Sequence, residues 1–273
     1  MDQYAVFGNP IAQSKSPFIH SAFAKETGEQ IEYKSQLVAV DGFEAAAAAF
    51  FERGGKGLNI TAPFKGDAYS YATQLSARAR RAGAVNTLAL QADGTILGDT
   101  TDGVGLVNDI RNNLAWPIKG QSVLILGAGG AARGVLQSLF EAEPNSICIA
   151  NRTASKAIAL AKGFADLGTI QGLGLHQLSE VEQGFDLIIS ATSAGLKGEE
   201  VNLPANILKP TSNVYDMIYS AEPTPFMRWA SSQAAQISDG LGMLVGQAAA
   251  SFGLWRNIQP ETKSIIAELR ESL

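Results

Sequence analysis

The most regular pattern of apolar positions lies in the second half of the chain, where short apolar runs alternate with stretches of helical character. Val123–Leu126 is wholly apolar, and comparable runs follow near 146–150, 186–190, 213–217 and 236–238. Strands that are separated by helices usually pair in parallel, because each helix carries the chain back across the sheet. This half therefore predicts a doubly wound parallel sheet of Rossmann type.

The first hundred residues predict a second, separate α/β unit. Three short strands alternate with helices that begin near Pro17, Phe43 and Pro63, and Asp93-Gly94 predicts a hairpin turn. Two C-terminal helices, Met243–Trp255 and Pro260–Leu273, are expected to pack back on this unit. The predicted domains are residues 1–101 with 241–273, and residues 102–240.

Composition supports two domains and excludes several classes of partner. A chain of 273 residues with 46% hydrophobic content is long enough for two cores. A net charge of −5 with no basic cluster argues against nucleic acid and anionic membranes as partners. The single Cys148, the absence of a signal-like start at Met1 and the lack of a long apolar run indicate a soluble cytoplasmic protein. A homodimer and a monomer both stay open.

A glycine turn follows the Val123 run. It comprises Gly127, Ala128, Gly129, Gly130 and Ala131, and Ala132 stands where a third glycine is common. Between a buried strand and a helix, such a turn lets backbone N–H groups approach a pyrophosphate. The alternative is a tight turn without a ligand, but the complete strand–helix–strand context favours a dinucleotide.

The end of the next strand indicates which dinucleotide. Neutral Asn151 stands where an acidic residue would bind a ribose 2′-hydroxyl, and Arg152 follows. A guanidinium suits a 2′-phosphate, so NADP is predicted rather than NAD. The alternative is that Arg152 is an ordinary surface arginine.

Two serines precede a helix that starts at Pro17. One of them, Ser14 or Ser16, is expected to cap the helix, and the other could bind a small carboxylate. The alternative is that both are turn or capping hydroxyls.

The segment Asn59–Lys65 brings an amide, a hydroxyl and an ammonium to the end of a strand, where ligands bind in open α/β sheets. Strand alternation places Asn59 and Thr61 on one side. The helix N-terminus disfavours a protonated Lys65 and a nearby carboxylate favours it, so this lysine could exchange protons. The alternative is a lysine that only reaches solvent.

Other polar residues are less specific. Asp102 precedes a helix and reads locally as a cap, and Gln247 lies on an apolar helix as a cleft residue or a buried amide. His20 and His176 are expected to be structural, and no metal-binding spacing occurs.

Together these segments closely resemble the shikimate dehydrogenase family over nearly the whole chain. The resemblance is carried by Ser14–Pro17, Asn59–Lys65, Gly83–Thr87, Asp99–Gly103, Gly127–Ala131, Asn151–Thr153, Tyr215–Tyr219 and Asp239–Gln247. It implies that the first domain with the C-terminal helices holds the substrate and that the middle domain holds NADP.

The resemblance also assigns roles. It implies that Lys65 carries the proton and that Asp102 pairs with it and orients the substrate hydroxyl. Substrate contacts are implied for Ser14, Ser16, Asn59, Thr61, Asn86, Tyr219 and Gln247. Cofactor contacts are implied for Gly127, Ala128, Gly129, Gly130, Ala131, Asn151, Arg152, Thr153, Lys156, Met217 and Gly240.

The implied reaction is the reversible NADPH-dependent reduction of 3-dehydroshikimate to shikimate. One rival is a quinate/shikimate dehydrogenase that prefers NAD, which an acidic residue in place of Asn151 would favour. Another is a catalytically silent NADP-binding regulator, which the loss of Lys65 or Asp102 would favour. One departure is visible, because Ala77-Arg78 stands where some relatives carry an acidic residue near the cofactor.

Overall fold

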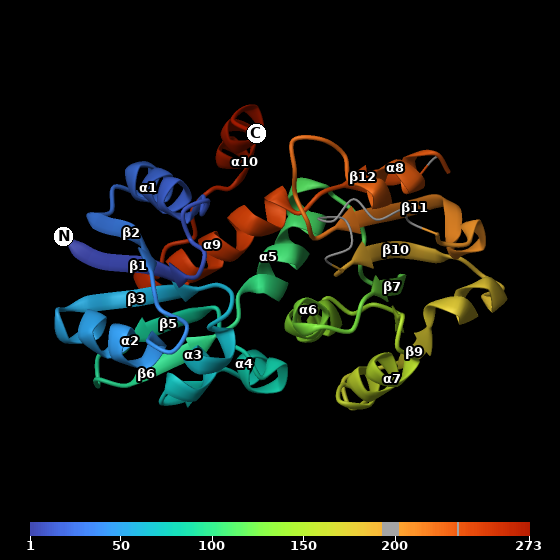
Figure 1. The fold of residues 1–273 in the computed structure, drawn as a ribbon. Coiled ribbons are helices and arrows are strands. Elements are labelled where there is room, and N and C mark those ends of the chain that lie inside the picture. The colour runs from blue at the N-terminus through green and yellow to red at the C-terminus, as the bar shows by residue number, and fades with distance from the viewer. Residues whose placement is uncertain (193–201, 234) are drawn as a thin grey trace. The chain divides into compact units, whose positions relative to one another are not determined.

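The chain forms two compact units, each with its own six-stranded sheet (Figure 1). The structure, a computed structural model, describes residues 1–192, 202–233 and 235–273. The first unit comprises Met1–Gly105 and Val245–Ala267, and the second comprises Leu106–Leu244 and Glu268–Leu273. The units divide within three helices, α5 (Asp102–Asn108), α9 (Leu241–Arg256) and α10 (Lys263–Glu271), whereas the expected boundaries lie at the starts of the first two.

The first unit contains a mixed sheet with the strand order β2-β1-β3-β5-β6-β4. β1 pairs in parallel with β2 and β3, and β5 and β6 form the expected antiparallel hairpin. Gly94 in its turn has a φ of 85°, which glycine adopts without strain. The strands are β1 (Asp2–Gly8), β2 (Ile31–Leu37), β3 (Gly55–Ile60), β4 (Gln74–Leu75), β5 (Thr87–Leu90) and β6 (Ile96–Asp99).

Alternate residues of β1 face the two sides of this sheet. Ala5 and Phe7 pack in a cluster with side chains of α2 (Phe43–Glu52), α3 (Lys65–Tyr71) and α4 (Ala77–Ala82). Tyr4 and Val6 face the other side, where Trp255 of α9 packs and where α1 (Ser16–Thr27) lies. Each fully buried large side chain contributes about 1.5–3 kcal/mol, so both layers are needed for a stable unit.

Two helices begin elsewhere than the sequence predicts. The helix expected at Pro63 starts at Lys65, because Ala62 and Pro63, which are joined by a cis peptide bond, form a turn instead. α1 starts at Ser16, and its N-cap residue is Lys15, whose side chain forms no capping hydrogen bond. The expected serine is therefore not at the N-cap position, although the Ser14 hydroxyl accepts the backbone N–H of Ser16 at the start of the helix.

The second unit contains the expected doubly wound sheet. Its order is β12-β11-β10-β7-β8-β9, and every pair is parallel, which is the arrangement of nucleotide-binding Rossmann folds. The strands are β7 (Ser122–Leu126), β8 (Ser146–Asn151), β9 (Ile170–Gly174), β10 (Phe185–Ser190), β11 (Leu208–Asp216) and β12 (Gln236–Ser238).

Helices cover both faces of this sheet, which explains its continuous apolar strands. Val123 and Ile125 pack with α6 (Gly130–Glu141) and α7 (Ala154–Lys162). Leu124 and Leu126 pack in a second cluster with side chains of the 3₁₀ turns η2 (Leu175–Glu180) and η4 (Ala205–Ile207) and of α8 (Pro225–Ser231). The single turn of π-helix η1 (Asp109–Asn113) continues α5.

The C-terminal helices join the first unit as expected, with one exception. In α9, the indole N–H of Trp255 donates to the carbonyl oxygen of Leu88 at 3.0 Å. α10 (Lys263–Glu271) is divided, since its last residues belong to the second unit, where Arg270 donates to Asp239 at 2.7 Å.

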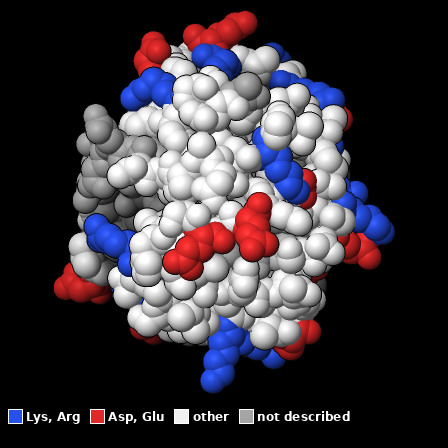
Figure 2. Space-filling model, turned by 90° about the vertical axis from the view of Figure 1, so that its right-hand side faces the viewer, with Lys and Arg blue, Asp and Glu red and all other residues white. Residues whose placement is uncertain are grey.

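The charged side chains of both signs are mixed on the surface. On the face drawn in Figure 2, Lys and Arg side chains are interspersed with Asp and Glu rather than gathered into one patch. Among the described residues, no helix combines the length and apolar character needed to cross a bilayer.

Candidate active site

Two loops of the first unit lie side by side at the carboxyl ends of the neighbouring strands β1 and β3. Backbone hydrogen bonds join them: Asn9 N–H donates to Ala62 at 3.0 Å, and Thr61 N–H donates to Phe7 at 2.9 Å. The first loop leads to Ser14 and the second leads to Lys65. The fold thus brings together two segments that the sequence separates by about fifty positions.

Lys65 and Asp102 form an ion pair. The Nζ atom of Lys65 lies 2.6 Å from Oδ2 of Asp102, and the two side chains are 38% and 20% exposed. An ion pair this open to solvent contributes at most about 1 kcal/mol to stability. Its position at the loops and its accessibility therefore indicate a role toward a ligand.

Asn86 holds the other oxygen of the same carboxylate. Its Nδ2 atom donates to Oδ1 of Asp102 at 2.8 Å and lies 3.5 Å from Oε1 of Gln247. Its own Oδ1 accepts the backbone N–H of Thr101 at 2.9 Å. These contacts bring Asn86, Asp102 and Gln247 together, as the resemblance implies.

The two serines differ in their surroundings. The hydroxyl oxygen of Ser14 accepts the backbone N–H of Ser16 at 3.3 Å, and the Ser14 side chain stays partly exposed. Ser16 is only 8% exposed, and its hydroxyl is hydrogen-bonded to the phenol of Tyr33. Ser14 is therefore the more accessible of the two to a ligand.

Asn59 lies deeper than expected. It is only 5% exposed, its Oδ1 accepts Tyr33 Oη at 2.7 Å, and its Nδ2 donates to Ser251 Oγ at 2.9 Å. An amide that is already hydrogen-bonded at both ends inside the protein has little capacity left for a substrate. These contacts favour a buried structural position for Asn59 over the expected substrate contact, which stays a prediction.

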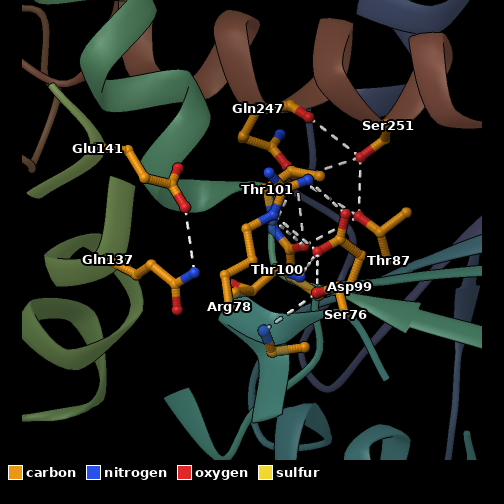
Figure 3. Close-up of polar contacts among 12 residues, drawn as sticks. Ser76, Arg78, Thr87, Asp99, Thr100, Thr101, Gln137, Glu141, Gln247 and Ser251 are labelled. Carbon is orange, nitrogen blue, oxygen red and sulfur yellow. Dashed lines mark hydrogen bonds and ion pairs between the residues drawn. The ribbon is translucent and has the colours of Figure 1, made fainter. Parts of the chain in front are cut away.

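Arg78, the departure noted in the sequence, pairs with the buried carboxylate of Asp99. The Nε of Arg78 donates to Oδ1 of Asp99 at 2.8 Å, and its Nη2 donates to Oδ2 at 2.5 Å (Figure 3). Asp99 also accepts the hydroxyl of Ser76 and the backbone N–H of Thr100. The arginine thus fixes the segment that leads to Asp102.

The glycine turn of the second unit joins β7 to α6. Gly127 has a φ of 105°, and a Cβ there would lie 3.0 Å from the carbonyl oxygen of Ala191. A Cβ on Gly129 or Gly130 would meet no atom within 4 Å. The N-cap residue of α6 is Gly129, which has no side chain to cap the first N–H groups of the helix, and such groups can bind a phosphate.

The residues that follow β8 are also largely exposed. Asn151 folds onto its own loop, since Nδ2 donates to the carbonyl oxygen of Thr153 at 3.0 Å. Arg152, Thr153 and Lys156 are exposed, and neither cation forms an ion pair with any residue that the structure describes. Two cations without acidic partners at this place suit a phosphate.

Met217 and Gly240 also come together, after β11 and β12. The backbone N–H of Gly240 donates to the carbonyl oxygen of Ile218 at 3.0 Å. A Cβ on Gly240 would lie only 2.2 Å from the carbonyl oxygen of Met217. Only glycine permits this approach. Tyr219, expected at the substrate, lies in the same loop of the second unit, and burial raises the pKa of its phenol.

Family models match most of the chain. Residues 6–88 match the substrate binding domain of shikimate dehydrogenase, residues 110–201 match shikimate / quinate 5-dehydrogenase, and residues 240–270 match the shikimate 5′-dehydrogenase C-terminal domain. A shikimate dehydrogenase (NADP(+)) of Saccharophagus degradans is 56% identical over the full length of both chains. The chain belongs to the shikimate dehydrogenase family.

Solved structures agree with this family membership. An Ael1 enzyme from Pseudomonas putida is 42% identical with a TM-score of 0.93, covering 98% of each chain. A shikimate 5-dehydrogenase from Thermus thermophilus, in complex with NADP(H) and shikimate, is 30% identical with a TM-score of 0.87 over the whole of both chains. The described residues contain no group of three His, Cys, Asp or Glu side chains that could hold a metal.

In this member of the shikimate dehydrogenase family, sequence reasoning misses three hydroxyls behind the site. Thr87, Thr101 and Ser251 are buried and hydrogen-bonded to one another (Figure 3). The two threonine hydroxyls also donate to Oδ1 of Asn86. One signal was available, because Ser251 follows Gln247 by four residues and so lies on the same face of α9.

Proposed function

We propose that this protein catalyses the reversible reduction of 3-dehydroshikimate to shikimate with NADPH. The observation that carries the proposal is the accessible Lys65–Asp102 pair, at the strand ends of a chain that belongs to the shikimate dehydrogenase family. The first unit would hold the substrate, and the second would hold the cofactor.

The substrate would be held mainly by neutral donors. Ser14 and Ser16 would bind its carboxylate, and Ser14 is the more accessible of the two. The ring hydroxyls would contact Thr61, Asn86, Gln247 and Tyr219. The close packing of Asn86 against Asp102 supports this arrangement, since it sets donor and acceptor groups side by side.

The cofactor would be held by the second unit. The open space at Gly129 and Gly130 fits a pyrophosphate, together with Gly127, Ala128 and Ala131. Arg152, with Lys156 and the loop residues Asn151 and Thr153, would hold the 2′-phosphate. Met217 and Gly240 would line the nicotinamide.

NADPH, when bound, supplies a hydride to the ring carbonyl carbon. Lys65 gives a proton to the carbonyl oxygen, which becomes the hydroxyl of shikimate, and takes that proton back in the reverse reaction. Asp102 holds Lys65 through one carboxylate oxygen. Asp102 therefore orients the group that moves the proton.

Purified protein assayed with shikimate and quinate, each against NADP and NAD, tests the proposal. Shikimate with NADP is expected to give the highest kcat/KM of the four pairs. Faster turnover of quinate with NAD would establish the quinate/shikimate rival. No turnover of any pair, with NADP still bound, would establish the silent regulator.

A further inference from the structure

A chain of buried hydrogen bonds leads from helix α1 to the proposed catalytic pair. It begins at His20 of α1, whose ring is fully buried and stacks on Tyr33 with centroids 4.1 Å apart. Burial lowers the pKa of His20 to about 3, so the ring is neutral and carries one proton. Its Nε2 lies 3.1 Å from Oδ1 of Asn59, whereas Nδ1 has no partner among the described residues, which places the proton on Nε2.

The side-chain amide of Asn59 is held in one orientation by its hydrogen bonds. Its oxygen accepts from His20 and Tyr33, and its nitrogen donates to Ser251 Oγ at 2.9 Å and to Thr87 Oγ1 at 3.2 Å. The backbone carbonyl oxygen of Asn86, which can only accept, lies 3.4 Å from the same nitrogen. The amide therefore has one orientation that satisfies all its neighbours.

The hydrogen bond from Asn59 also determines how the Thr87 hydroxyl is oriented. Because Asn59 donates to its oxygen, the hydroxyl proton of Thr87 is available for Oδ1 of Asn86 at 2.9 Å. Ser251 lies 2.8 Å from Thr87 and donates to the carbonyl oxygen of Gln247 at 3.0 Å. Both hydroxyls are completely buried, so no solvent replaces either of them.

The chain ends on the Asp102 carboxylate. With its oxygen turned toward Thr87 and the N–H of Thr101, the amide of Asn86 presents its nitrogen to Oδ1 of Asp102. The second carboxylate oxygen is then left for Lys65. We infer that Asn59, Thr87 and Ser251 are positioning residues that hold the Asn86 amide in the orientation that orients Asp102 and Lys65.

This inference rests on the proposed function for its kinetic test, which uses the Thr87 hydroxyl, because it lies nearer to Oδ1 of Asn86 (2.9 Å) than the Thr101 hydroxyl does (3.2 Å). Thr87→Val keeps the side-chain shape and removes the hydroxyl. Loss of one neutral hydrogen bond in the chain is expected to lower kcat about three- to tenfold and to leave the KM for NADP unchanged. Thr87→Ser restores the hydroxyl and is expected to return kcat to within about twofold of wild type.

A matched control separates positioning from general loss of stability. Thr73→Val makes the same change in the same unit, at an exposed residue whose hydroxyl, among the described residues, bonds to the backbone of Ile96. Its melting temperature is expected to fall while kcat stays at the wild-type value. Ser251→Ala, a change that favours a helix, gives a second variant should Thr87→Val fail to fold.

Crystal structures of wild type and Thr87→Val test the inference independently of activity. The expected result is that the Asn86 nitrogen leaves Oδ1 of Asp102 in the variant. An unchanged 2.8 Å contact, an unchanged kcat, or an equal loss in Thr73→Val would overturn the positioning role. Failure of the wild type to oxidise shikimate would refute the proposed function alone, because the crystal structures still decide the positioning role.

Discussion

The ammonium of Lys65 and the carboxylate of Asp102 face each other at 2.6 Å, from the first residues of two different helices. Lys65→Ala is expected to lower kcat at least about a hundredfold with little change in KM, because positioned proton transfer contributes about 10²–10⁴-fold. Steady-state kinetics with shikimate measure this effect. A rise in KM with kcat preserved would make Lys65 a binding residue.

The same pair is expected to act as one unit. Asp102→Asn removes the charge that holds Lys65 and should also lower kcat. The double variant with Lys65→Ala should be little slower than Lys65→Ala alone, because the carboxylate acts largely through the lysine. Fully additive losses in a double-mutant cycle would show that the two residues act separately.

Arg152 should decide the choice between NADP and NAD. Loss of a charged hydrogen bond costs about 1.5–3 kcal/mol, so Arg152→Ala should raise the KM for NADP by about one to two decades. The KM for NAD, which lacks the 2′-phosphate, should hardly change. Equal weakening of both cofactors would exclude the 2′-phosphate role.

A substitution at Gly129 tests the pyrophosphate site, which both cofactors would share, rather than the 2′-phosphate site. An added Cβ meets no atom within 4 Å in the protein, so Gly129→Ala should fold with wild-type stability. The methyl group would occupy space expected for the pyrophosphate and should raise the KM for NADP and NAD alike. Thermal unfolding together with kinetics on both cofactors checks this pattern, and unchanged KM values would place the pyrophosphate elsewhere.

Ser14 should contribute to binding through the substrate carboxylate. Ser14→Ala is expected to weaken the binding of shikimate more than that of an analogue without the carboxylate, because a hydrogen bond to an anion is stronger than a neutral one. Calorimetry on the two ligands measures the difference. Equal losses would leave Ser14 as a turn hydroxyl bonded to Ser16.

Because His20 is buried in its neutral form, the free energy of unfolding is expected to depend on pH. The unfolded chain protonates this ring near pH 6.5, whereas the folded chain resists protonation until about pH 3. The unfolded state thus binds more protons in this window, and the free energy of unfolding falls as pH is lowered, by up to about 1.4 kcal/mol per pH unit from this group.

Urea unfolding at several pH values measures the slope of the free energy of unfolding against pH. His20→Gln should reduce it while lowering stability overall, because the stacking on Tyr33 is lost. The matched control is His176→Gln, at an exposed position, which should leave the slope unchanged. A slope that is the same in His20→Gln and wild type would contradict the prediction.

The strands of the second unit could be predicted because most of them are buried on both faces and read as apolar runs. β9 could not, since Ile170–Gly174 contains two glycines and a glutamine. It forms because it pairs with β8 and because Gly172 lets α7 approach: a Cβ there would lie 2.3 Å from the backbone of Ala157. Packing between elements thus overrides the local preference.

Asn59 illustrates the same limit within the site. Strand alternation identifies the side on which its amide lies, but its partners come from α1, β2, β5 and α9, up to 192 positions away. Local sequence cannot reveal that these groups occupy the amide. Lys65 and Asp102 could be paired only through the family resemblance, since 37 residues separate them.

The division of the first unit between the two ends of the chain determines when it can fold during synthesis. Asn59 and Thr87 are synthesised early, but their partner Ser251 is made only after Leu106–Leu244, the main part of the second unit. At about 5–20 residues per second, roughly 8 to 40 seconds pass between the synthesis of these residues and that of Ser251. Until Ser251 is made, the nascent first sheet lacks the helix that covers one of its faces, whereas the last strand of the second sheet, β12, is complete at Ser238. The Rossmann unit is therefore expected to become protease-resistant first on stalled ribosomes, and the proposed catalytic unit last.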